Sequence, residues 1–67
     1  LGSVVSVRFA APGGASVAPL WQVPVGALAD AAPPPGMDVV EVTDVTAAVA
    51  EMRRRHPVDN VRRLPST

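Results

Sequence analysis

The stretch MDVVEVTDVTAAVAEMRRRHPVDNVRRLP, residues 37 to 65, decides the fold because its patterning changes from β-type to helical and back. Residues 37–44 are rich in β-branched side chains and predict a strand. In residues 45–56 apolar side chains recur at helical spacing, which predicts an amphipathic helix. The expected buried stripe of that helix consists of Val45, Ala48, Val49, Met52 and His56.

The sequence also marks the ends of this helix. Thr43 or Asp44 is expected to supply the N-cap, and Pro57 ends the helix. Residues 58–65 then predict a further strand. A strand, a helix and a strand joined by short connections form a βαβ unit, so we expect the two strands to be parallel and their crossover right-handed.

The N-terminal half predicts a β-hairpin. Alternation in residues 4–10 predicts a half-buried strand whose apolar face consists of Val5, Val7 and Phe9. The same alternation in residues 20–25 predicts a second strand whose apolar face consists of Trp21, Val23 and Val25. The turn chemistry of residues 11–16 joins them. Because Pro24 has no amide donor, we expect the second strand to lie at a sheet edge or to be interrupted there.

The segment between the hairpin and the βαβ unit is rich in alanine and proline. Residues 26–32 have room for one or two helical turns, and the sequence leaves their conformation open. The PPPG stretch, residues 33–36, stops any helix and forms a stiff connector. The elements together predict an α+β fold, a small two-layer sandwich in which the main helix, 45–56, covers a sheet of about four strands.

The length of 67 residues allows one domain with a thin core. Cysteine is absent and the only aromatic residues are Phe9 and Trp21, so contact with a partner or self-association would add needed burial. We expect Leu1–Ser3 to be the remnant of an expression tag, and residues 4–67 to be a single domain excised from a larger protein. Arginine without lysine, with abundant alanine, valine and proline, indicates a GC-rich coding sequence and a bacterial source.

Five of the six arginines lie in residues 53–63, which raises the question of a nucleic-acid surface. The formal net charge of the chain is zero, and acidic residues precede the basic ones in the C-terminal half. Residues 37–51 carry a net charge of −4 and residues 52–67 a net charge of +4. This order favours internal pairing, with Glu51 bound to Arg54 or Arg55. We therefore favour solvated arginines at the helix C-terminus over binding of nucleic acid.

No group of residues predicts catalysis, a cofactor or a metal. His56 has no second histidine or cysteine at a ligand spacing, and the hydroxyl residues occur in no nucleophile motif. The pair Gly13 and Gly14 is too short for a phosphate-binding loop and lacks the strand–GxGxxG–helix context of one. We expect hydrated surface charges at Asp38, Glu41, Asp44 and Glu51. The sequence therefore predicts a protein that is not an enzyme.

Two sets of residues are candidates for binding a partner. The first is the predicted edge strand, where Trp21 either fills the core or anchors a partner protein, since tryptophan is enriched in interface hot spots. Its members are Trp21, Val23 and Pro24. The second set is basic and consists of Arg53, Arg54, Arg62 and Arg63. No apolar run approaches the roughly 20 residues of a membrane span, and no secretory signal is visible, so the compartment stays open with the cytoplasm favoured.

Residues 39–65 resemble the C-terminal half of subtilisin-type protease propeptides. The resemblance rests on a strand, a helix that begins after Thr or Ser and ends in an Arg-rich turn, and the pattern P-x-V-x-x-V. The matching positions are Thr43, Val49, Met52, Arg54, Pro57, Val58 and Val61. It implies a ferredoxin-like sandwich that assists the folding of its protease and then inhibits it, with Leu64 to Thr67 entering the protease cleft. Residues 11–36 depart from the family, which has a full helix there.

Three functions follow from these observations. The first is a non-catalytic protein-interaction or accessory domain that acts through a sheet edge or by self-association into a homo-oligomer, so that its partner is another protein, a second copy or the rest of its own chain. The second is the propeptide-like chaperone and inhibitor. The third is weak nucleic-acid binding through the arginines of residues 53–63.

Overall fold

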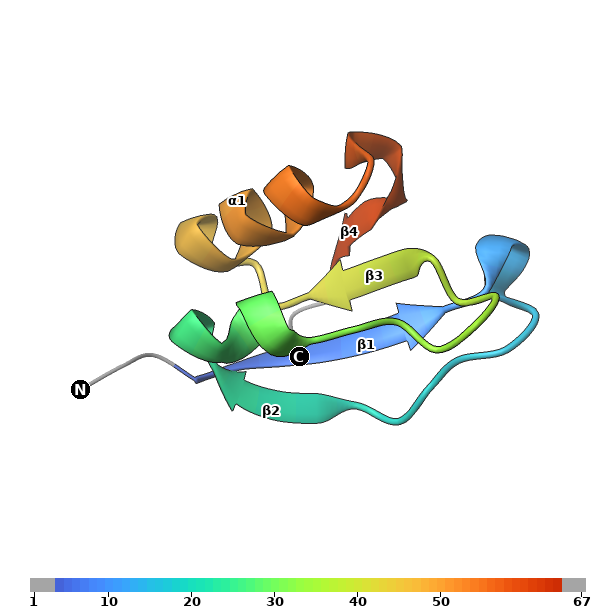
Figure 1. Ribbon diagram of the computed structural model, residues 1–67, viewed down its shortest axis with the longest axis horizontal. Coiled ribbons are helices and arrows are strands. Elements are labelled where there is room, and N and C mark those ends of the chain that lie inside the picture. Colours follow the sequence, from blue (N-terminus) through green and yellow to red (C-terminus); the bar gives the residue numbers. More distant parts are fainter. Residues whose placement is uncertain (1–3, 65–67) are drawn as a thin grey trace.

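Strand β1 (Val4–Ala10) lies inside a four-stranded sheet with the order β2-β1-β3-β4. It pairs antiparallel with β2 (Trp21–Pro24) on one side and antiparallel with β3 (Val39–Val42) on the other. This computed structural model describes residues 4–64, so the expected tag remnant and Pro65–Thr67 lie outside the described residues. The strands β2 and β4 (Val61–Arg63) therefore form the two edges of the sheet (Figure 1).

The βαβ unit has the predicted parallel arrangement. After β3 the chain forms helix α1 (Thr46–Arg55) and a short 3-10 turn, η3 (Val58–Asn60), before β4. Strands β3 and β4 pair directly and in parallel. Both strands are shorter than predicted, because Met37 and Asp38 precede β3 and Val58 lies in η3 rather than in β4.

The helix ends as predicted at its C-terminus, but its predicted N-cap is wrong. The N-cap residue is Val45, and no side chain among residues 4–64 caps the helix. Thr43 instead accepts a hydrogen bond at Oγ1 from the Ser6 amide, 2.8 Å away, and the Thr43 amide donates to the Ser6 carbonyl. Asp44 pairs with Arg63. Contacts with distant strands therefore use both of the side chains that could have capped the helix.

One face of the sheet carries the core. Helix α1 and the 3-10 helix η2 (Val25–Asp30) both lie on this face (Figure 1). The predicted strand face and helix stripe are confirmed, and Leu28 of η2 joins them. The buried cluster consists of Val5, Val7, Phe9, Leu28, Val40, Val42, Ala48, Val49 and Met52. Burying each large aliphatic side chain contributes roughly 1.5–3 kcal/mol, so burial of this cluster is a large favourable term in folding.

The hairpin of β1 and β2 is confirmed, with a long connection between its strands. A 3-10 turn, η1 (Pro12–Gly14), follows β1. Gly13 and Gly14 have φ angles of 79° and 75°, a backbone conformation that residues other than glycine rarely adopt. Strand β2 ends at Pro24, as expected for an edge strand. Val25, predicted to continue that strand, instead begins η2 and packs against the core.

The order of the strands differs from the ferredoxin-like arrangement that the propeptide resemblance implies. A ferredoxin-like βαββαβ fold has two helices, and another strand separates its parallel strands. Here β3 and β4 are neighbours, and the helices within residues 11–38 are the short 3-10 helices η1 and η2. Whether the chain acts as a propeptide stays a prediction.

Candidate interaction surfaces

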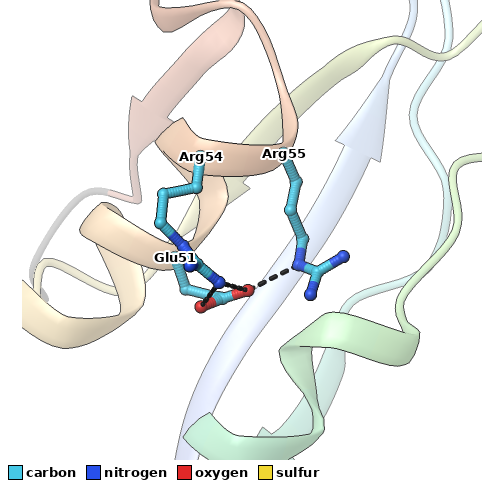
Figure 2. A network of polar contacts seen from close by, with 3 residues as sticks. All are labelled: Glu51, Arg54 and Arg55. Carbon is cyan, nitrogen blue, oxygen red and sulfur yellow. Dashed lines mark hydrogen bonds and ion pairs between the residues drawn. The ribbon is translucent and has the colours of Figure 1, made fainter.

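The arginines of α1 do not form one cationic surface. The Glu51 carboxylate lies between Arg54 and Arg55, one helical turn further along (Figure 2). Arg54 Nη2 donates to Glu51 Oε1 at 2.9 Å, and Arg55 Nε donates to Glu51 Oε2 at 2.5 Å. These hydrogen bonds, first from Arg55 and then from Arg54, hold the pKa of Glu51 below its ordinary value. The predicted pairing of Glu51 is confirmed with both arginines.

The arginines of β4 lie on opposite faces of the sheet. Arg63 is in register with Val42, which faces α1, and its Nε lies 2.8 Å from Asp44 Oδ1. Arg62 is in register with Glu41 on the face without helices. There Arg8 Nη2 lies 2.6 Å from Glu41 Oε1, a pairing between β1 and β3 that the sequence did not indicate. Within residues 4–64, Arg53 and Arg62 form no ion pair.

A shallow hollow lies between α1 and β4. The basic residues Arg53 and Arg63 line it together with Asp44, Thr46, Val49 and Ala50. The positions in α1 are three or four residues apart, so they share the side of the helix that faces β4. Of the predicted basic set, Arg53 and Arg63 line the same hollow, while Arg54 points to Glu51 and Arg62 lies on the other face.

Trp21 lies on edge strand β2, on the same face of the sheet as Val7. Its ring packs edge-on against Phe9, with centroids 6.2 Å apart and an interplanar angle of 88°. Yet 42% of the residue is exposed, so Trp21 both covers the core and offers a surface. Val23 is half-buried against the core, and Pro24 is exposed at the end of the strand.

The sequence did not single out the exposed aliphatic residues next to Trp21. Val17 and Leu20 lie in the connection that leads into β2, and each is more than half exposed. With Trp21 they place three large apolar side chains within five residues of one sheet edge; we call this stretch, residues 17–21, the β2 edge segment. A loop without periodicity gives no sign of which apolar residues stay exposed.

His56, the only histidine, packs at the end of α1. His56 follows the last residue of α1, its amide donates to the Met52 carbonyl, and its ring lies 6.2 Å from that of Phe9. This is the packed histidine at the helix end that the sequence predicted. In the part of the chain that the structure describes, no three histidine or acidic side chains gather as metal ligands would.

Comparisons with known proteins give no assignment: no family model matches the chain, and neither does any curated protein or solved structure. Among residues 4–64, every helix is too short or too polar to cross a lipid bilayer.

Proposed function

We propose that this chain is a non-catalytic protein-interaction domain that binds through its β2 edge segment. The observation that supports it most is the position of Trp21, which is 42% exposed on an edge strand and adjoins two exposed aliphatic residues. Tryptophan loses little side-chain entropy on binding and supplies a large contact area, so partly exposed tryptophans are common interface anchors.

Side-chain packing, more than backbone pairing, would form this contact. Strand β2 is four residues long and ends in a proline, which has no amide to donate to a further strand. A short edge that contains proline is a poor template for a long intermolecular ladder. The apolar side chains beside it remain available to a partner.

The partner that this surface favours is a second copy of the chain. In a two-fold contact the same segment meets itself, so apolar residues meet apolar residues without a separate complementary surface. The formal net charge of zero removes the long-range repulsion that would oppose association of identical chains. Association would also cover a core built from few residues.

Trp21 is the only tryptophan, so its fluorescence reports on this surface without any substitution. If two copies meet there, sedimentation will show a dimer as concentration rises, and the emission of Trp21 will shift to shorter wavelength over the same range. The Trp21→Ala variant should stay monomeric. Val58→Ala is the matched control because Val58 is 59% exposed but lies in η3, away from β2.

Two results would count against the proposal. A monomer at every concentration, with unchanged emission, would remove the second copy as partner. Equal dimerisation of the native chain and a folded Trp21→Ala variant would place the contact on another surface.

A further inference from the structure

We propose that the hollow between α1 and β4 binds a carboxylate side chain of an acidic polypeptide segment, held between Arg53 and Arg63. This site lies by the sheet edge opposite β2, so it is separate from the surface proposed above for self-association.

The two arginines that line the hollow have guanidinium donors that form no ion pair within residues 4–64. Arg53 forms no ion pair within residues 4–64, and it lines the hollow together with Arg63. The ion pair of Arg63 uses Nε, which leaves the two terminal nitrogens of its guanidinium group as donors. Asp44 and Arg63 are more than half exposed, so their mutual attraction is screened by water and yields readily to a competing acid.

The start of α1 adds donors to the same wall. Thr46 is the first residue of the helix and lines the hollow, and in the part of the chain that the structure describes no side chain caps this helix. The first amide groups of an α-helix have no partner within the helix, and the positive end of the helix dipole lies beside them. The lining of the hollow therefore combines two guanidinium groups, a hydroxyl and the helix N-terminus.

The charge of the hollow favours a carboxylate over a phosphate group. Arg53 and Arg63 together with Asp44 leave one net positive charge on the lining. A single carboxylate neutralises that charge, whereas a phosphate dianion would leave the occupied hollow with a net negative charge. Val49 and Ala50 form an apolar part of the lining, which suits the methylene groups of a glutamate and an apolar neighbour in a peptide.

The probe for this site is a capped peptide of alternating leucine and glutamate, with a glutamine-for-glutamate peptide as its control. Titration followed by NMR should shift the amide signals of Thr46 and Ala47 and the guanidinium signals of Arg53 and Arg63. The glutamine peptide should leave these signals in place. Inorganic phosphate should bind more weakly than the glutamate peptide.

Substitutions distinguish binding in the hollow from a general attraction of the peptide to the positive charge of the helix. Arg53→Gln should weaken binding of the glutamate peptide roughly threefold to tenfold. Arg54→Gln, the next residue of the same helix, should change it little because Arg54 is paired with Glu51. Asp44→Asn should strengthen binding, since it frees Arg63 and removes a negative charge. Trp21→Ala should leave binding of the glutamate peptide unchanged, so this proposal and the proposed self-association are tested independently.

The proposal is overturned if the two peptides bind alike, or if neither shifts the signals of the hollow. Equal weakening by Arg53→Gln and Arg54→Gln would also overturn it, because the positive charge of the whole helix would then explain the binding. Tighter binding of phosphate than of the glutamate peptide would reject the carboxylate as the ligand.

Discussion

At the residue scale, Glu51 shows how one acidic side chain can pair with two arginines. Its partners are three and four residues away on the same helix, a spacing that the sequence alone displays. The interaction is local, so it could be predicted before the fold was known. It is also the reason that two of the three consecutive arginines, 53–55, are not free to form a cationic surface.

The stabilising effect of Glu51 should depend on pH. Because Arg55 and Arg54 hold its pKa below the ordinary value of 4.5, the folded state favours the ionised carboxylate. The contribution to stability is therefore fully present above pH 4.5 and is lost as pH falls through the lowered pKa of the folded state. Thermal unfolding of the native chain and of Glu51→Gln should show a higher Tm for the native chain at neutral pH.

That difference in Tm should shrink toward zero in acid. Asp59→Asn is the control, because Asp59 is an exposed carboxylate with no ion pair in residues 4–64 and should show little difference at any pH. A gap between the native chain and Glu51→Gln that stayed constant from neutral to acidic pH would mean that the ion pairs do not stabilise α1.

Thr43 shows where reasoning from sequence fails at the same scale. A threonine just before a helix is a common N-cap, and nothing local distinguishes it from one that pairs with a distant strand. Its hydroxyl and amide meet Ser6, 37 residues earlier in the chain, and so extend the pairing of β1 with β3. The strand register of the folded sheet decides this contact, and the sequence gives no register for strands so far apart.

At the scale of elements, periodic segments could be predicted and short ones could not. The alternation in β1 and the helical stripe of α1 each have several apolar positions, so the pattern gave both the type of element and its buried face. The 3-10 helix η2 covers six residues and contains one fully buried side chain, too few for a period. The surface hollow depends on how α1 and β4 lie together, which no single element encodes.

Leu28 should matter more than its short helix suggests. It is fully buried and joins η2 to the core that α1 and the sheet form. Leu28→Ala should lower the free energy of unfolding by about 2–5 kcal/mol, through lost burial and the cavity left behind. Since a chain of this length has a total stability of roughly 3–10 kcal/mol, the variant should be close to unfolding.

The matched control for this loss is the same substitution at an exposed position. Leu20→Ala removes the same atoms from a residue that is 52% exposed, and it should change stability by less than about 0.5 kcal/mol. Urea unfolding of dilute samples measures both variants without interference from association. Similar losses at Leu28 and Leu20 would show that η2 does not pack on the core as described.

At the scale of the whole molecule, charged and apolar groups are distributed differently at the two sheet edges. The β2 edge adjoins exposed apolar residues, whereas the β4 edge carries Arg62 and Arg63 and adjoins the hollow. The face without helices is crossed by the ion pair of Arg8 and Glu41. An apolar contact at one edge and a charged contact at the other therefore need not compete for the same surface.

If the β2 edge segment joins two copies, the stability of the fold should rise with protein concentration. Association removes folded monomers from the unfolding equilibrium, so each tenfold increase in concentration should raise Tm by roughly 5 °C for a chain of this size. Scanning calorimetry of the native chain over a wide concentration range measures this slope. Trp21→Ala should have a lower Tm, because the contact with Phe9 is lost, and no slope.

The slope, and not the absolute Tm, distinguishes an interface from a core contact. Val58→Ala should keep the slope of the native chain, because Val58 is exposed in η3 and not near β2. A native chain whose Tm is independent of concentration would show that Trp21 stabilises the fold only from within one copy. A partner at the β2 edge segment would then have to be a different protein. The free energy of unfolding of the isolated domain would come from its own thin core.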